Sequence, residues 1–445
     1  MLAFLIMNKA NLCVKNSCDE LRLTRRSFFT LAIIFLAICT VLPVLSANAS
    51  SQAPKLEWEH FFSGFVGYTV LQTSDGGFMI SGVNFSSTIL IKTDSGGNLL
   101  WTRSYELGGT NTSLPYLIQT KNGGYALGGT INNEYVVVKV DSVGIIEWHK
   151  SFFLDEPYNS FRGFVQTSDG GYAFVGTFSP PQNATHAVGQ IWFVKIDSSG
   201  NMQWNKTIVG PQGDFANSIV QNSDGGYAIF CTSWESETLP SAFKIIKTDS
   251  SGNELSNKTY GGSGSFFTAE SDAGIETRDG GYLLAGVSVD KGTDYLAWLV
   301  KTDYEGNMLW NQNYGGFGSW ALAVTQSSDG GYCFAGLYNG KGVWLVKTDS
   351  VGAVEWNETF SGASIWGVSV EDFGKPLIQA RNGGYVLVGS LDSQIWVAQL
   401  ASSNASITGF SFYLVVAAAV VLIIVIVVVV ATILRRRTCV RATLA

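Results

Sequence analysis

Residues 329–356 read DGGYCFAGLYNGKGVWLVKTDSVGAVEW, and this stretch decides the fold because its pattern recurs along the chain. Its opening phrase, Asp/Asn-Gly-Gly followed by an aromatic residue, occurs seven times. The first glycines of successive copies are 47, 47, 55, 55, 50 and 53 residues apart. A repeat of this size is typical of propellers and solenoids. These glycines are Gly76, Gly123, Gly170, Gly225, Gly280, Gly330 and Gly383.

Each repeat predicts four strands. The first strand ends at an Asp-Gly-Gly hairpin, whose glycine supplies the positive φ that a tight turn needs, and the second begins at the aromatic residue. After a variable loop, a third strand over residues 344–349 leads through the turn 349–352 into a fourth strand that contains Trp356. Four-stranded units of this length are propeller blades.

The two ends of the array predict how the ring closes. The seventh repeat has a third strand at residues 395–400 and no fourth strand after it. The missing strand lies near the N-terminus, where LEWEHFFSG (56–64) matches VEWNETFSG (354–362). An N-terminal strand that completes the last blade leaves no open sheet edge. We therefore predict an all-β fold, a seven-bladed β-propeller closed by an N-terminal strand.

The pattern DGGY…WLVKTDSxGNxxW resembles the repeat of extracellular propeller proteins of archaea and some bacteria, over about residues 55–400. The Asp-x-x-Gly-x-x-x-Trp segment is also similar to two structural turns. It has one residue fewer between Asp and Gly than the tryptophan-docking motif of quinoprotein dehydrogenases, and two more from Asp to Trp than the Asp-box of sialidases. The resemblance implies that the indole packs between blades, without catalysis. These positions are Trp58, Trp101, Trp148, Trp204, Trp310 and Trp356, with Ser256 in the remaining blade.

Both ends of the chain predict a membrane protein. Residues 412–434 are an apolar run long enough to span a bilayer as a helix, and the arginines 435–437 that follow place the tail in the cytoplasm. At the N-terminus, an apolar stretch at 28–45 precedes Ala47-Asn48-Ala49, as in a secretory signal peptide. Residues 24–29 resemble a twin-arginine signal, and an uncleaved anchor would give the same topology.

The predicted organisation follows from these segments. It comprises a signal peptide (1–49), a short lead (50–54), the propeller ectodomain (55–401), a short stalk (402–411), a transmembrane helix (412–434) and a basic cytoplasmic tail (435–445). We expect a single-pass protein of the cell membrane with its ectodomain outside.

Charge and composition exclude several classes of function. Without the charged residues near its two ends, nine basic and two acidic, the chain keeps 19 bases and 33 acids, a net charge of −14 that repels nucleic acid. Three His residues lie in different repeats, and Cys231 and Cys333 are the only cysteines of the predicted ectodomain. The sequence therefore predicts no metal site, no cofactor and no catalytic triad, and it favours free, buried thiols over a disulfide.

One polar position recurs at the end of the innermost strand of each blade. These side chains either line the central channel or bind backbone groups at blade junctions, and the second interpretation is favoured because a regular repeat is typical of a scaffold. The same reasoning applies to the lysine two residues before each turn aspartate. The innermost-strand residues are Gln72, Gln119, Gln166, Gln221, Glu276, Gln326 and Gln379.

The loops divide between two faces of a propeller. Hairpin turns and third-to-fourth-strand turns share one face, the regular face, and are uniform here. Loops between blades and between second and third strands share the other, the variable face, and carry aromatic residues beside carboxylates, which suit sugar rings or a protein partner. The binding candidates are Tyr158, Asp214, Phe215, Trp234, Phe266, Phe267, Phe317, Trp320 and Trp366.

We therefore expect a membrane-anchored cell-surface propeller that binds a glycan or protein, for adhesion or envelope organisation. The alternative is an extracellular hydrolase or lyase that uses carboxylates of the variable face. Glycosylation is expected at one or more sequons, because three of them follow the outer-strand Trp position at the solvent edge. The sequon asparagines are Asn84, Asn111, Asn183, Asn205, Asn257, Asn357 and Asn404.

Overall fold

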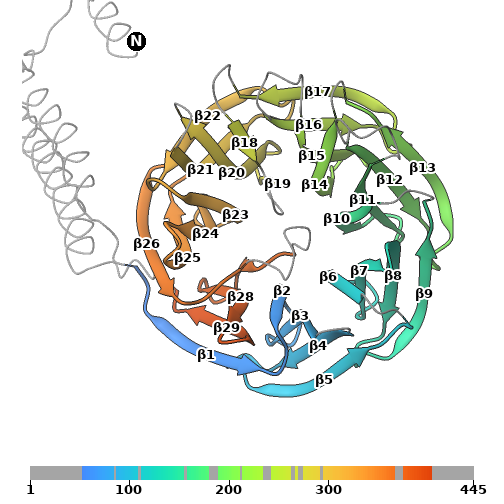
Figure 1. The fold of residues 1–445 in the computed structure, drawn as a ribbon, viewed down its shortest axis with the longest axis horizontal. Coiled ribbons are helices and arrows are strands. Elements are labelled where there is room, and N and C mark those ends of the chain that lie inside the picture. Colours follow the sequence, from blue (N-terminus) through green and yellow to red (C-terminus); the bar gives the residue numbers. More distant parts are fainter. Residues whose placement is uncertain are drawn as a thin grey trace, which may run out of the picture. The chain divides into compact units, whose positions relative to one another are not determined.

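The computed structural model forms seven antiparallel sheets arranged in a ring (Figure 1). It describes residues 53–84, 87–108, 112–154, 158–179, 189–210, 213–233, 242–261, 266–268, 274–290, 294–365 and 374–402. The predicted signal peptide and transmembrane helix lie outside these ranges. Within them, there is no helix of the length and apolarity that crossing a membrane requires.

Blades 1 to 4 each consist of four consecutive strands. Blade 1 contains β2 (Val66–Gln72), β3 (Phe78–Asn84), β4 (Ser87–Thr93) and β5 (Leu99–Tyr105). Blade 2 contains β6 (Thr112–Gln119), β7 (Tyr125–Ile131), β8 (Glu134–Val140) and β9 (Ile146–Phe152). Blade 3 contains β10 (Tyr158–Gln166), β11 (Tyr172–Ser179), β12 (Gln190–Ile196) and β13 (Met202–Ile208). Blade 4 contains β14 (Asp214–Gln221), β15 (Tyr227–Ser233), β16 (Ala242–Thr248) and β17 (Glu254–Tyr260).

Blades 5 to 7 vary this plan. The innermost strand of blade 5 has two pieces, β18 (Phe266–Thr268) and β19 (Gly274–Glu276), and both pair with β20 (Tyr282–Asp290), which precedes β21 (Asp294–Thr302) and β22 (Met308–Tyr314). Blade 6 contains β23 (Ser319–Gln326), β24 (Tyr332–Tyr338), β25 (Gly342–Thr348) and β26 (Val354–Ser361). Blade 7 joins β27 (Leu377–Gln379), β28 (Tyr385–Leu391) and β29 (Gln394–Leu400) to β1 (Leu56–Phe62).

The β1–β29 pairing closes the ring, as the sequence predicts. Leu56 lies opposite Leu400, and Phe62 lies opposite Ile395. The amide of Ala401 also donates to the carbonyl of Lys55 at 2.9 Å. The propeller extends into the predicted lead, because Pro54 is buried and Ala53 packs on the core between blades 6 and 7.

The hydrophobic core lies between blades, since the second and third strands of each sheet are buried on both faces. At six of the seven junctions, an outer-strand indole packs on the aromatic residue that follows the next blade's hairpin. Trp148 lies 6.0 Å from Tyr172, and Trp356 lies 5.6 Å from Tyr385, measured between ring centroids. Trp58, Trp204 and Trp310 pack in the same way on Phe78, Tyr227 and Tyr332, and Trp101 packs in the cluster that contains Tyr125.

Candidate functional site

The regular face is built from a repeated turn that encloses a lysine. In blade 1, Gly76 adopts a φ of 87°, and a Cβ on Gly77 would lie 2.7 Å from the Lys92 ammonium. The buried Lys92 Nζ pairs with Asp75 at 2.9 Å. Partial burial raises the pKa of Asp75, but hydrogen bonds from Thr73, Lys92 and the Gly77 amide outweigh it and hold this pKa at about 2. Equivalent pairs are Asp169–Lys195, Asp279–Lys301 and Asp329–Lys347.

The innermost-strand glutamines join neighbouring blades, which confirms the favoured interpretation of that position. Gln166 donates to the Gly170 carbonyl of its own hairpin and accepts from the Lys121 amide of the preceding blade at 2.9 Å. Gln72 does the same across the closure, where it accepts from the Arg381 amide at 2.7 Å. These amides therefore link neighbouring blades and stabilise the ring.

The junction between blades 4 and 5 departs from the repeat. Ser256 occupies the Trp position, and the Tyr304 ring stacks on Tyr282 instead, with centroids 6.3 Å apart. Lys247 lies over this ring at 3.2 Å and donates to the Tyr304 carbonyl at 2.7 Å, while the Tyr304 hydroxyl donates to Asp224. The hydrogen bond to Asp224, with burial, raises the pKa of Tyr304 to about 12. The tyrosine thus fills the space of the absent indole.

Asp214 lies at the variable face, but its carboxylate does not reach solvent. The side chain is fully buried and pairs with Lys244 at 2.8 Å. Lys244 occupies the third-strand position held by Trp344 in blade 6, so a charged group replaces a core indole. The expectation of an exposed carboxylate at Asp214 is therefore wrong, because this carboxylate is buried and pairs with Lys244 inside the blade.

An aromatic pair lies on the variable face where blades 5 and 6 meet. Trp320, at the start of β23, stacks on Tyr295, at the start of β21, with centroids 5.5 Å apart and planes 10° from parallel. Tyr295 is 39% exposed and Phe317, in the loop before β23, is 63% exposed. Trp320 and Phe317 were predicted from the sequence. Tyr295 was not among the predicted binding residues. Its position just after the loop between the second and third strands of blade 5 could have identified it.

The other candidates are distributed around the same face. Phe215 is partly buried, and its ring lies where a side chain on Gly189 would stand. Tyr158 begins β10, and Phe266 and Phe267 form most of β18, for which only the backbone is described. Trp234 and Trp366 lie outside the described residues.

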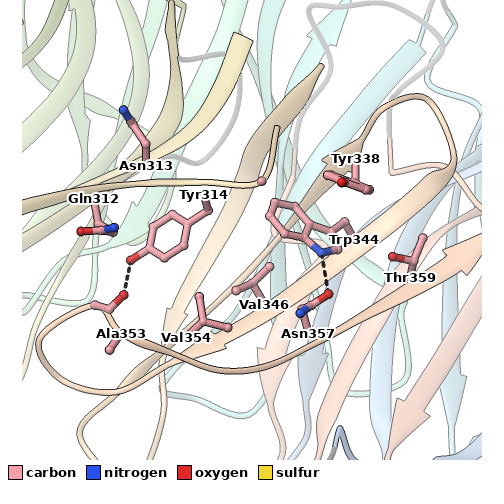
Figure 2. Close-up of a pocket in the computed structure, with 12 residues that line it drawn as sticks. Gln312, Asn313, Tyr314, Tyr338, Trp344, Val346, Ala353, Val354, Asn357 and Thr359 are labelled. Carbon is pink, nitrogen blue, oxygen red and sulfur yellow. Dashed lines mark hydrogen bonds between the residues drawn. The ribbon is translucent and has the colours of Figure 1, made fainter. Parts of the chain in front are cut away.

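A pocket of about 460 Å³ opens between the outer strand of blade 5 and the last two strands of blade 6. Figure 2 shows Gln312 and Asn313 of β22 on one side, and Trp344, Asn357 and Thr359 on the other. The Trp344 indole donates to the Asn357 Oδ1 at 3.3 Å.

Sequons and cysteines complete the set of sequence candidates. Asn84, Asn205, Asn257 and Asn357 have exposed side chains on strands, whereas Asn111, Asn183 and Asn404 lie outside the described residues. Cys231 and Cys333 are free and buried, and burial raises the pKa of both thiols well above its ordinary value. Over the described part of the chain, no three His, Cys, Asp or Glu side chains are grouped as metal ligands.

Comparisons with known proteins found distant structural likenesses and no related sequence. No protein-family profile matches the sequence, and no curated protein matches it. Among solved structures, puromycin hydrolase is 12% identical with a TM-score of 0.49, over 74% of this chain and 50% of that one. A protein of unknown function from Dyadobacter fermentans is 10% identical (TM-score 0.46; 79% and 97% covered). One from Bacteroides caccae is 15% identical (TM-score 0.39; 67% and 94% covered).

Proposed function

We propose that the protein is a membrane-anchored cell-surface receptor whose variable face binds a glycan. The observation that carries this proposal is the nearly parallel Tyr295–Trp320 pair. The exposed Phe317 precedes Trp320 by three residues, in the loop before β23. Flat, rigid aromatic groups offer a large contact area at a low cost in side-chain entropy, and they pack well on the apolar faces of sugar rings. The pair spans two blades, so the scaffold fixes its position.

The direction of the chain suits a receptor. Strand β29 ends at Leu400 on the regular face, where it meets the start of β1 at Leu56. The proposed transmembrane helix begins at residue 412, so the regular face is the one from which the chain leaves for the bilayer. In the proposed topology, the chain therefore leaves the propeller on the face opposite the variable face.

The test is a glycan array probed with the soluble ectodomain, residues 50–402. For any glycan that binds, we expect Tyr295→Ala and Trp320→Ala each to weaken binding about tenfold, because a lost stacking contact of about 1.4 kcal/mol corresponds to that factor. Phe61→Ala is the matched control, since Phe61 is 44% exposed but lies on the outer strand of blade 7. Absence of any glycan ligand, or equal losses for Phe61→Ala and Trp320→Ala, contradicts the proposal. Binding to a purified protein partner alone would replace the glycan with that partner.

A further inference from the structure

The pocket of about 460 Å³ between blades 5 and 6 is lined by the asparagine and the threonine of one sequon. Asn357 and Thr359 are two positions apart on β26, and alternate residues of a strand share one face. Both side chains therefore line the pocket between blades 5 and 6, and Asn357 is exposed. A sugar attached to Asn357 would start inside this pocket.

Hydrogen bonding distinguishes Asn357 from Asn205 and Asn257, the two sequon asparagines at the same place in other blades. The Nδ2 atom, to which an N-linked sugar is joined, has no partner among the described residues at Asn357, while Oδ1 is held by the Trp344 indole. By contrast, Nδ2 of Asn257 donates to Glu254 at 2.6 Å, and Nδ2 of Asn205 contacts the Met202 sulfur at 3.3 Å. The indole fixes the Asn357 side chain and leaves the reactive nitrogen free.

The walls of the pocket offer groups that suit a sugar. Tyr338 and Trp344 supply aromatic surface, with ring centroids 5.3 Å apart. Gln312 and Asn313 supply amides opposite them, and Asn313 keeps its Nδ2 donor because its Oδ1 accepts from Ser288 at 2.8 Å. The hydroxyl groups of a sugar can bind the amides, and the apolar face of its ring can pack on the aromatic side chains.

We propose that Asn357 carries an N-linked glycan whose first sugars occupy this pocket and bridge blades 5 and 6. The donor is an oligosaccharide on a lipid phosphate or diphosphate. Its anomeric carbon forms a bond to Nδ2 of Asn357, the carbon–oxygen bond to the phosphate breaks, the lipid phosphate leaves and Nδ2 loses one proton. The proposal is independent of the ligand site on the variable face.

The first measurement is glycopeptide mass spectrometry on the full-length protein, made in cells shown to glycosylate one of their own exported proteins. We expect the glycan at Asn357 in the unmodified chain and in Thr359→Ser. We expect its loss in Thr359→Val, which keeps Asn357 and its indole contact but removes the hydroxyl of the sequon. An unmodified Asn357 in such cells overturns the proposal, as does a Thr359→Val protein that keeps the glycan.

The second measurement separates a glycan in the pocket from one that points into solvent. An amidase that cleaves the sugar–asparagine bond is applied to the folded and to the denatured protein. We expect release from Asn357 at least tenfold slower in the folded protein, and a smaller difference at Asn257 wherever that residue is also modified. Equal rates at Asn357 in the two states overturn the placement in the pocket.

Discussion

The indole N–H of Trp396 donates to the Glu59 carboxylate at 3.0 Å, although 337 residues separate the two in sequence. Trp396 is 1% exposed, so this donor has little access to water. The contact occupies the place of the Trp192–Asn205, Trp298–Asn311 and Trp344–Asn357 bonds in other blades. The closing strand thus reproduces both the ladder and the side-chain bond of an ordinary fourth strand.

We expect Glu59→Leu to lower the free energy of unfolding by about 1 kcal/mol, because it leaves the Trp396 indole without an acceptor. Glu59→Gln keeps an acceptor oxygen and should change stability much less. Urea unfolding of the ectodomain followed by Trp fluorescence measures both. If the two variants unfold at the same urea concentration, the Trp396–Glu59 hydrogen bond does not contribute to stability.

Removal of β1 should open the ring. A protein that begins at Gly64 loses the β1–β29 ladder and the packing of Trp58 on Phe78, where loss of the indole alone costs about 3–5 kcal/mol. The bare edge of β29 should then pair between molecules. Light scattering measures the association between molecules, and thermal unfolding measures the loss of stability. The control begins at Ala53, because Pro54 is buried and belongs to the folded part. A monomer with an unchanged melting temperature would contradict the closure.

The blade 4–5 junction predicts a compensating pair of substitutions. Ser256→Trp alone should lower stability by about 1–3 kcal/mol, since Tyr304 already fills the space of the indole. Tyr304→Ser alone should also lower it, because Tyr282 and Lys247 lose a packing partner. The double variant restores the pattern of the other blades and should be more stable than the sum of the two changes predicts. Additive effects in a double-mutant cycle would show that the two sites are independent.

The buried Asp214–Lys244 pair predicts that removing one charge destabilises the protein much more than removing both. Lys244→Met leaves a buried carboxylate without its partner and should cost about 3–5 kcal/mol. The double variant Asp214→Leu/Lys244→Met removes both charges and should unfold close to the unmodified protein. Chemical denaturation of the three proteins measures this. Equal losses in the single and double variants would exclude the ion pair as the cause.

The hairpin aspartates predict a loss of stability in acid. The pKa of Asp75 and that of Asp169 are both about 2, below the ordinary value of 3.8, because their hydroxyl, lysine and amide hydrogen bonds outweigh partial burial. Their contribution is present above pH 3.8 and is lost as the pH falls toward 2. Asp75→Asn/Asp169→Asn should flatten the stability profile in this window. A profile that keeps its slope would assign the acid sensitivity to other groups.

Sequence repetition predicted the parts of the fold that recur. The seven Asp/Asn-Gly-Gly hairpins give the blade count, and the match of 56–64 to 354–362 gives the closing strand. The second turn glycine of blade 1, Gly77, is required because a Cβ there would lie 2.1 Å from the Thr93 carbonyl oxygen. Each of these inferences uses residues that are near in sequence or repeated.

Features that depend on a single opposing side chain were not predicted. Asp214 has an ordinary sequence context, and its burial follows only from Lys244, 30 positions away, which stands where other blades have an apolar residue. Tyr304 lies in a turn that elsewhere carries Ser, and only the empty space left by Ser256 explains its packing. The pocket beside Asn357 depends on the distance between two blades, which no pattern within one repeat specifies.

Closure by β1 also has a consequence for biosynthesis. Among the strands that the structure describes, β1 leaves the ribosome first and its partner β29 is made last, 337 residues later for Glu59 and Trp396. At roughly 5–20 residues per second, that interval lasts about 20 to 70 s. Throughout it, Leu56, Trp58, Phe61 and Phe62 are an unpaired, partly apolar strand. A holding chaperone should therefore capture nascent chains that have passed β1 but have not reached β29.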